Sequence, residues 1–417
     1  MSGDIPLDEP MPLDEVDFFD PEVNDCPYHA YRTLRDDAPV WYDERLRGFL
    51  VTRHDDVLEV LRDSERFVST PPSRNMPDRE VYAEKGWVPA TTLANRDDPN
   101  HRQMRNLFDH AFRPKRLSAL EPQIESLAHE LIDDFIDGGS CDWVRQFAVP
   151  LPLVVIGIQM GADPDDIWRI KSWTDAWIQK LGLMQTSEQR RWSVEMEIEA
   201  QHYFQPIFER LREEPDDTLL SDLVNTVIPE WGRTLTDEEL HAEMMADTFV
   251  GGSETTTNAL SGGVRLLIEH PDQWDRLKSD PDRYLPRLIE EVVRLEAPVQ
   301  RLMRHTAVEV ELHGVTIPEG STILVGYSAA NRDDRTFDAP ARFDLDRDDA
   351  KKHVSFGFGA HHCLGAPLAR RELKHGFAAL VERIDEMWFV DDTDLTIAPN
   401  YFLRALRELK IGFRPAA

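Results

Sequence analysis

A single cysteine, Cys363, lies in the segment FGFGAHHCLGAPLARREL, directly before a predicted helix. Apolar residues repeat at helical spacing after it, at Leu368, Leu373 and Phe377. Backbone N–H groups and the positive dipole end at a helix start favour a thiolate over a thiol. A low-pKa thiolate suits a nucleophile or a soft metal ligand, and the sequence has no GxSxG-like or papain-like context for a nucleophile. A plain buried thiol is the ordinary alternative for a lone cysteine.

The residues around Cys363 favour a flat partner over a small metal ion. Three glycines, Gly357, Gly359 and Gly365, let the backbone bend tightly and approach a planar group closely. A zinc site built from HHC is excluded on geometry, because three consecutive residues can hardly all face one tetrahedral ion.

A second stretch with chemical potential is FVGGSETTTNALSGG, within a helix predicted over residues 236–268. Thr236 and Glu239 form a capping box at its start, and Pro271 follows its end. Two glycines and three threonines in its middle lower the helix propensity. Such a local conflict is expected at functional sites, and a close helix–helix crossing at the glycines is the structural alternative.

Composition narrows the function classes. The 417 residues contain 47 Lys and Arg against 78 Asp and Glu, and the formal net charge of −31 disfavours nucleic acid and anionic lipid surfaces. Three widely spaced cysteines without a CxxC motif disfavour a disulfide framework or a zinc ribbon. The start of the chain lacks a signal-peptide pattern and no stretch is long and apolar enough to span a bilayer, so a cytoplasmic protein is expected.

Helical patterns dominate the chain, and strand-like alternation is confined to short pieces such as GFLVTR, VEVELHGVTIPEG and TILVGYSA. No internal repeat or Gly/Ser linker marks a domain boundary. The sequence predicts one mainly α domain with a small β-rich lobe over residues 21–417. Residues 1–20, which are acidic and proline-containing, are expected to be disordered.

The segment FGFGAHHCLG resembles the haem-binding loop of the cytochromes P-450, whose pattern is FGxGxHxCxG. The matching positions are Phe356, Gly357, Gly359, His361, Cys363 and Gly365. His362 departs from the family, which more often has an aromatic or apolar residue there. The resemblance implies a triangular-prism fold with haem b, iron protoporphyrin IX, between the long central helix and the cysteine-loop helix. Cys363 would then be the axial thiolate ligand of the iron.

The resemblance extends to the residues expected to bind the haem propionates. His101 and Arg105 lie at i,i+4 on a predicted helix and match the family's HxxxR element. Arg304 in APVQRLMRHT and His361 complete the set, and charge-assisted hydrogen bonds from such groups would fix the porphyrin.

The central stretch resembles the family's oxygen-binding groove, [AG]GxxT, which implies haem contact at Gly252. Thr255 would supply a hydroxyl beside dioxygen, and Glu254 would pass protons inward through water. The presence of this pair favours dioxygen and two electrons, because family members that use peroxide directly often lack it. A peroxide-driven peroxygenase and a non-catalytic haem sensor or carrier stay open as alternatives.

A third element, EEVVRLEAP, places Glu291 and Arg294 at i,i+3 and matches the family's ExxR. The resemblance implies a buried structural pair joined by a later arginine, for which Arg342 is the expected residue. By family position, the substrate pocket is expected to be mostly apolar. Its expected residues are Trp87, Val88, Val250, Gly251, Val299, Leu302, Met303, Tyr401 and Phe402.

Basic residues gather around the cysteine in an otherwise acidic chain. They are Arg102, Arg113, Lys115, Arg116, Lys351, Lys352, Arg370, Arg371, Lys374 and His375. If they share the proximal face, they would attract a small acidic redox protein. The expected partner is a ferredoxin or flavodoxin served by an NAD(P)H reductase. The motifs are most similar to those of actinobacterial members, so a monooxygenase acting on a steroid, terpenoid or lipid is expected.

Overall fold

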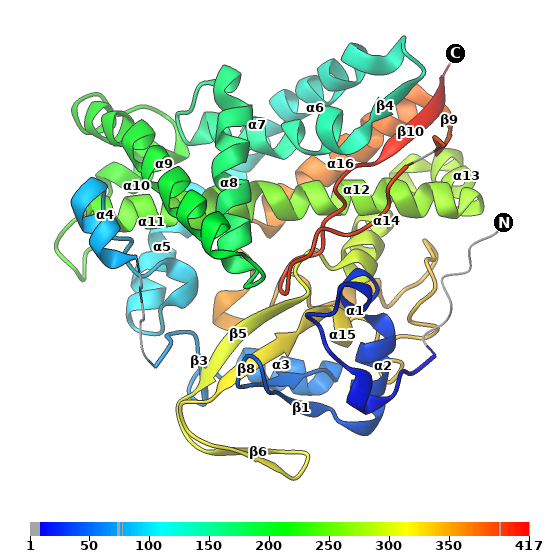
Figure 1. Ribbon diagram of the computed structural model, residues 1–417. Coiled ribbons are helices and arrows are strands. Elements are labelled where there is room, and N and C mark those ends of the chain that lie inside the picture. Colours follow the sequence, from blue (N-terminus) through cyan, green and yellow to red (C-terminus); the bar gives the residue numbers. More distant parts are fainter. Residues whose placement is uncertain (1–8, 73–75, 77, 392, 417) are drawn as a thin grey trace.

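The computed structural model describes residues 9–72, 76, 78–391 and 393–416, and helices make up most of it (Figure 1). The first helices are α1 (Pro21–Asp25), α2 (Tyr28–Asp37), α3 (His54–Arg62), α4 (Arg79–Lys85), α5 (Asn100–Ala111), α6 (Pro114–Ile136), α7 (Pro150–Gln159) and α8 (Ile167–Leu181). The later ones are α9 (Ser187–Glu213), α10 (Leu219–Asn225), α11 (Asp237–Glu243), α12 (Thr255–Glu269), α13 (Pro271–Ser279), α14 (Pro281–Glu296), α15 (Tyr327–Ala330) and α16 (Ala366–Arg383). The predicted mainly α class is confirmed.

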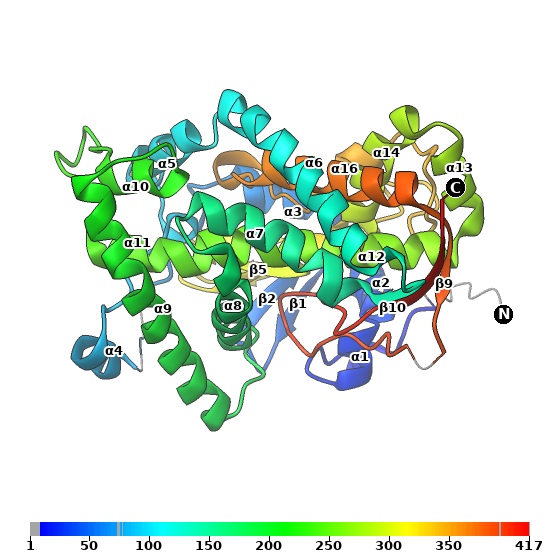
Figure 2. The same cartoon turned by 90° about the horizontal axis from the view of Figure 1, so that it is seen from above.

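The long central helix is continuous but changes its winding in the middle. The capping box at Thr236 is present, because its hydroxyl accepts from the Glu239 N–H and the Glu239 carboxylate accepts from the Thr236 N–H. Between α11 and α12 the chain forms π-helical turns over Met244–Glu254, where the sequence showed low helix propensity. Such turns are rare and occur frequently at functional sites. Figures 1 and 2 show this helix crossing the middle of the molecule.

The helices pack around one large apolar core. Helix α16 lies against α6 and the central helix, and α8 packs along α9. Leu260 and Val264 of α12 and Phe377 of α16 are fully buried in this core. Burial of such apolar surface is the main stabilising contribution to the fold. None of the helices in the described part of the chain combines the length and apolar character needed to cross a membrane.

The β-rich lobe lies at the lower end of Figure 1. Its five-stranded sheet has the order β1-β2-β8-β5-β3. The strands are β1 (Val40–Asp43), β2 (Gly48–Val51), β3 (Phe67–Val68), β5 (Arg301–Thr306) and β8 (Thr322–Gly326). Two further sheets contain β4 (Ser140–Asp142), β9 (Ile384–Phe389) and β10 (Lys410–Pro415), and the hairpin β6 (Val310–Leu312) with β7 (Val315–Ile317). β5 pairs with β8 antiparallel, with Arg304 opposite Ile323.

The N-terminal segment is more ordered than its composition predicted. Residues 1–8 lie outside the described residues, but Leu13–Glu15 form a 3-10 turn and Phe18 is only 1% exposed. The Phe18 ring lies 5.2 Å from that of Tyr31 and 6.3 Å from that of Tyr401. The prediction of disorder is therefore wrong for this part of the segment, because its buried aromatic side chain anchors it to α2 and the C-terminal segment.

Candidate haem-thiolate site

The cysteine loop is a tight turn that ends directly before α16. The Cys363 N–H donates to the Phe356 carbonyl at 2.7 Å, which closes the loop. Gly357 and Gly359 have φ angles of +67° and +72°, in the left-handed region that favours glycine. At Gly359 a Cβ would also lie 2.7 Å from the Leu61 carbonyl oxygen. The glycines predicted from the motif thus have a direct steric reason.

Cys363 itself is half-buried. Burial raises the pKa of its thiol above the ordinary value, although the N–H groups of Gly365 and Ala366 and the charge of Arg105 lower it. The N–H groups at the helix start thus act in the predicted direction, but in the protein alone desolvation outweighs them. A bound metal ion would reverse the balance, since a thiol that coordinates a cation is deprotonated.

Four predicted anion-binding residues come together beside this loop. The rings of His101 and His361 lie 3.9 Å apart. Arg105 donates from Nη1 to the His362 carbonyl at 2.9 Å, so α5 is fixed to the cysteine loop. Arg304 acts electrostatically on both histidines, which places its guanidinium in the same cluster. Ser69 contacts His361 through Oγ and Nε2 at 3.1 Å.

The cluster has unused hydrogen-bonding capacity. The Nε2 atom of His101 is buried and has no hydrogen-bond partner among the described residues. Burial and the charge of Arg105 lower the pKa of His101, and burial and Arg304 lower that of His361 to about 3. At neutral pH both rings are therefore neutral. Two guanidinium groups and two neutral imidazoles fit the two carboxylates of a haem b.

The central helix presents Thr255 and Glu254 in different directions. Thr255 is half-buried, and its hydroxyl donates to the Gly251 carbonyl at 3.2 Å. Glu254 is buried and accepts from the Thr174 hydroxyl at 2.8 Å and from Lys171 Nζ at 3.2 Å, both on α8. Burial lowers the pKa of Lys171, but the carboxylates of Glu254 and Asp175 raise it by more, so the pKa lies above its ordinary value. Glu254 is thus held as an ion pair, and its side chain has partners other than the Thr255 hydroxyl.

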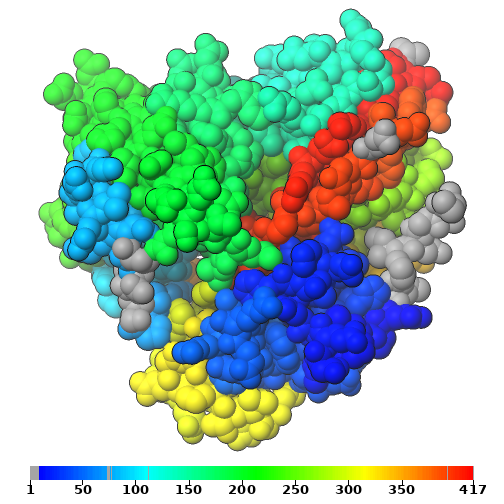
Figure 3. Space-filling view, viewed as in Figure 1, coloured from blue at the N-terminus to red at the C-terminus, as the bar shows by residue number. Residues whose placement is uncertain are grey.

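A cavity that the sequence did not predict leads to Glu254. It has a volume of about 550 Å³ and lies between the end of α8, the start of α9 and the C-terminal segment. Figure 3 shows these segments meeting at the surface, with the end of α8 and the start of α9 in green and the C-terminal segment in red. Gln179, Gln189 and Asn258 line it together with Glu254. Most of the lining surface is apolar, but these polar side chains can bind water in the cavity.

The two adjacent glycines of the central helix have different surroundings. A Cβ at Gly252 would lie 3.1 Å from Ile156 of α7, so a close helix crossing accounts for this glycine. Gly251 is exposed, and a Cβ there would meet only the Ala246 carbonyl at 3.9 Å. The helix-crossing alternative therefore applies to Gly252, and haem contact there stays a prediction. Gly251 is the glycine that faces open space.

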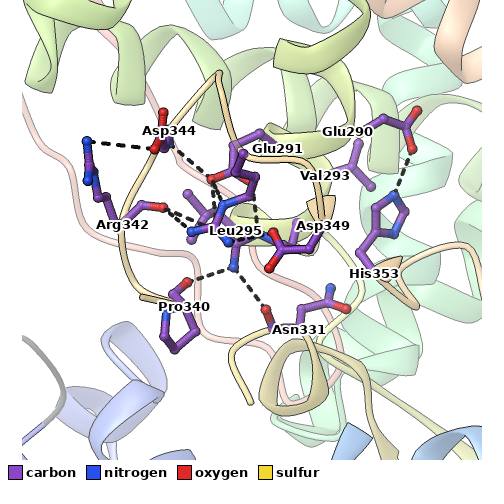
Figure 4. A network of polar contacts seen from close by, with 12 residues as sticks. Glu290, Glu291, Val293, Leu295, Asn331, Pro340, Arg342, Asp344, Asp349 and His353 are labelled. Carbon is purple, nitrogen blue, oxygen red and sulfur yellow. Dashed lines mark hydrogen bonds and ion pairs between the residues drawn. The ribbon is translucent and has the colours of Figure 1, made fainter. Parts of the chain in front are cut away.

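The predicted structural pair is the centre of a buried network (Figure 4). Glu291 and Arg294 are fully buried and joined by two hydrogen bonds of 2.7 and 2.8 Å. Arg347 donates from Nε to Glu291 at 3.0 Å, so it is the third member. The prediction of Arg342 is wrong: its side chain is 66% exposed and contributes only its backbone carbonyl to Arg294. The sequence offered several arginines in this stretch and no signal that distinguished Arg347.

This network extends to the cysteine loop through Asn331. The Asn331 carbonyl accepts from Arg294 Nη1 at 3.0 Å, and its side chain binds the Ser355 hydroxyl at 2.6 Å and the Val354 N–H at 2.8 Å. Ser355 in turn donates to the Val293 carbonyl at 2.7 Å. The residues directly before Phe356 are therefore fixed to α14.

The predicted pocket residues divide into three groups. Val299, Leu302 and Met303 are half-buried, and Val250 on the central helix is 6% exposed. Tyr401 and Phe402 are 0% and 1% exposed, and these two predictions are wrong, because such side chains leave no surface for a ligand.

The physical reason is packing against the N-terminal part of the chain. The Tyr401 hydroxyl donates to Asp43 at 2.9 Å, and its ring packs against Phe19.

The third group, Trp87 and Val88, contacts α9 and α11. The Trp87 ring lies 4.6 Å from the ring of His241, and Val88 packs against Tyr82, Val194 and Ile198.

Fold and site together define a haem-thiolate protein, with a cysteine loop, a cluster that fits two propionates, and a distorted central helix. A model of the cytochrome P-450 family matches residues 167–386. The chain belongs to the cytochrome P-450 family, whose members bind haem b through a cysteine thiolate, and it is a cytochrome P-450 monooxygenase.

The relatives cover almost the whole chain. The steroid C26-monooxygenase of Mycolicibacterium smegmatis is 32% identical over 390 residues, which cover 93% of each chain. The 6-deoxyerythronolide B hydroxylase of Saccharopolyspora erythraea is 33% identical over 398 residues, or 92% of this chain and 95% of that protein. The crystal structure of a Bacillus megaterium cytochrome P-450 in complex with testosterone matches with a TM-score of 0.80 and 32% identity. The matched region covers 93% of this chain and 99% of the chain in that structure.

Proposed function

We propose that this enzyme inserts one oxygen atom from dioxygen into an apolar small molecule, a steroid, terpenoid or lipid, with electrons from a ferredoxin or flavodoxin. The observation that carries the site is the half-buried Cys363 next to a cluster of Arg105, Arg304 and two neutral histidines. Cys363 would ligate the iron, and the cluster would hold the propionates. When bound, haem b supplies the activation of dioxygen.

The substrate class is supported by the side chains of the candidate pocket and by the relatives. Val250, Val299, Leu302 and Met303 are apolar, and mostly apolar walls suit an apolar ligand. One relative is named as a steroid C26-monooxygenase, one as a 6-deoxyerythronolide B hydroxylase, and one structure is a complex with testosterone. A panel of steroids tested by spin-state shift of the Soret band and by product analysis examines this proposal. If no steroid shifts the band or is oxidised, this part of the proposal fails.

Glu254 and Thr255 have separate proposed tasks. Water in the cavity beside Glu254 gives protons access to the carboxylate, and Lys171 and Thr174 hold that carboxylate in place. The Thr255 hydroxyl, which accepts as well as donates, passes a proton to the reacting oxygen. Because their side chains have different partners, transfer between them requires water or a rotation of Glu254.

Replacing Thr255 tests the proton delivery. We expect Thr255→Ala to lower the yield of hydroxylated product per NADPH about tenfold, with hydrogen peroxide formed instead, because a positioned proton donor is lost. Thr255→Ser, which keeps the hydroxyl, should restore most of the yield. Equal coupling in all three proteins would contradict the assignment, and full activity with hydrogen peroxide alone would favour the peroxygenase alternative.

The surface proposed to bind the electron donor carries less positive charge than the sequence indicated. Arg370 binds Glu290 at 2.7 and 3.0 Å, and Arg371 binds Glu121 at 3.0 Å. Burial raises the pKa of Glu290, but hydrogen bonds from His353 and Arg370 outweigh burial and hold this pKa at about 2, so the carboxylate stays charged. Four exposed lysines remain as the main candidates for attracting an acidic partner: Lys115, Lys351, Lys352 and Lys374.

Charge reversal at Lys374 tests this surface. We expect Lys374→Glu to lower the second-order rate of reduction by an acidic ferredoxin about tenfold at low ionic strength, because it replaces attraction with repulsion. Lys85→Glu is the matched control: Lys85 is exposed on α4, far from α16 in both ribbon views. Equal rates for the two variants would rule out the proposed surface. The cytoplasmic location expected from the sequence stays a prediction.

A further inference from the structure

One carboxylate on the central helix lies on the same face as the residues proposed to meet the haem. Asp247 is half-buried, Gly251 is exposed and Thr255 is half-buried, at intervals of four residues. Between them, Thr248, Phe249 and Ser253 are at most 5% exposed. The helix crosses the middle of the molecule (Figure 2), and the proposed position of Thr255 beside the haem puts this exposed face at the substrate space.

The contacts of Asp247 hold it at the edge of this space. Its Oδ2 accepts from the Ala94 N–H at 2.9 Å, and the Thr92 hydroxyl also binds it. Glu243, one turn earlier, accepts from the Leu93 N–H at 2.6 Å. The segment Thr92–Ala94 is thus bound to the central helix through two carboxyl groups. Both groups are polar, whereas the sequence predicted a mostly apolar pocket.

The two carboxyl groups share one proton. Glu243 is 1% exposed, and its Oε2 receives no hydrogen bond from any described residue. Burial and the charge of Asp247 raise the pKa of Glu243 well above its ordinary value. Burial also raises the pKa of Asp247 above its ordinary value, although hydrogen bonds from Ala94, Thr92 and Glu243 partly offset this rise. Of the two groups, Glu243 is the one that holds the proton, and its hydrogen bond favours the charged form of Asp247.

No cation of the described residues neutralises this charge. No described Lys, Arg or His contributes to the pKa shift of Asp247. Arg96, the cation that acts on Glu243, is bound to Glu239 at 3.2 Å and to the Thr91 carbonyl at 3.1 Å. A half-buried carboxylate without a cationic partner is stabilised by an added hydrogen-bond donor, and bonds to charged groups are the strong ones.

We propose that Asp247 is the polar anchor of the substrate pocket and selects an apolar substrate that carries a hydrogen-bond donor, a hydroxyl or an amine. The same charge excludes substrates with a carboxylate at that end. This inference rests on the proposed function, because it requires Thr255 to lie beside the haem. Asp247 precedes Thr255 by eight residues, so the donor would lie on the order of 10 Å along the helix from the reacting carbon.

Probes that bind the iron independently of the natural substrate test the anchor. The probes are imidazoles that carry an alkyl chain of varied length, centred on a span on the order of 10 Å. The far end of the chain is an alcohol, its methyl ether or a carboxylic acid. Binding is followed by the Soret shift of the haem-loaded protein. In the unaltered enzyme we expect the alcohol to bind about tenfold more tightly than the ether, because only the alcohol donates to Asp247. If the alcohol and the ether bound with equal affinity at every chain length, the inference would be overturned without any variant.

The variant Asp247→Asn should reduce the preference for the alcohol over the acid about tenfold, by weakening alcohol binding and strengthening acid binding. Opposite changes for two ligands separate this effect from a general loss of structure. Glu238→Gln, which removes an exposed charge from the same helix, is the control and should leave the preference unchanged. An unchanged preference in Asp247→Asn overturns the anchor. A steroid panel that fails while these probes behave as expected overturns the steroid proposal alone.

Discussion

A Cys363→Ser chain is expected to lose monooxygenase activity to background while it still binds haem. The thiolate donates electron density that favours cleavage of the O–O bond, and a serine hydroxyl does not ionise to replace it. Retention of haem is expected because Arg105, Arg304 and the two histidines are untouched. The measurement is the absorption spectrum of the reduced protein under carbon monoxide, together with the haem content per chain.

The expected spectrum is a Soret band at the shorter wavelength typical of a neutral axial ligand. Cys26→Ser is the control, because Cys26 is a half-buried free thiol in the N-terminal part of the chain. It should keep the long-wavelength band that gives the family its name. If Cys363→Ser also kept that band, Cys363 would not be the ligand.

The second large effect is expected at Glu291, on stability. Its carboxylate is 1% exposed and accepts from Arg294, Arg347 and the Asp344 N–H. Glu291→Ala leaves the buried Arg294 without a carboxylate and Arg347 with only that of Asp349, which should lower the free energy of unfolding by about 3–5 kcal/mol. Urea unfolding of the haem-loaded protein, followed by far-UV circular dichroism, measures this.

Two arginine variants make this prediction specific to the observed network. Arg347→Ala removes a 6% exposed side chain that binds Glu291 and Asp349, and it should also be strongly destabilising. Arg342→Ala removes a 66% exposed side chain and should change stability by less than about 0.5 kcal/mol. The comparison holds even if Glu291→Ala does not fold. Equal destabilisation by the two arginine variants would contradict the network.

The sequence predicted the site best where a motif fixes backbone geometry. The glycines of the cysteine loop, the HxxxR spacing and the capping box at Thr236 are local features, and their residues are determined by turns and helix periodicity. Arg304 was assigned from its match to the family's propionate-binding arginine, and it lies on β5 opposite Ile323 of β8. In these cases a few adjacent residues contain the necessary information.

The errors concern contacts between distant segments. Arg342 and Arg347 are both in an arginine-rich stretch, and only the path of the backbone decides which side chain reaches Glu291. Tyr401 is buried because residues from the other end of the chain, including Phe18 and Asp43, pack against it. Asp247 was missed for the same reason: the segment that binds it is about 150 residues earlier in sequence. Periodicity along one helix shows a face but not what lies opposite.

The connection from α14 through Asn331 to Ser355 has a consequence for how the cofactor enters and leaves. The residues directly before the cysteine loop are held by hydrogen bonds within the protein, which need no haem to form. The backbone entropy of this segment is therefore lost when the chain folds and not when the cofactor binds. Haem affinity then gains from preorganisation, and release of the cofactor leaves the loop folded and ready to accept another haem.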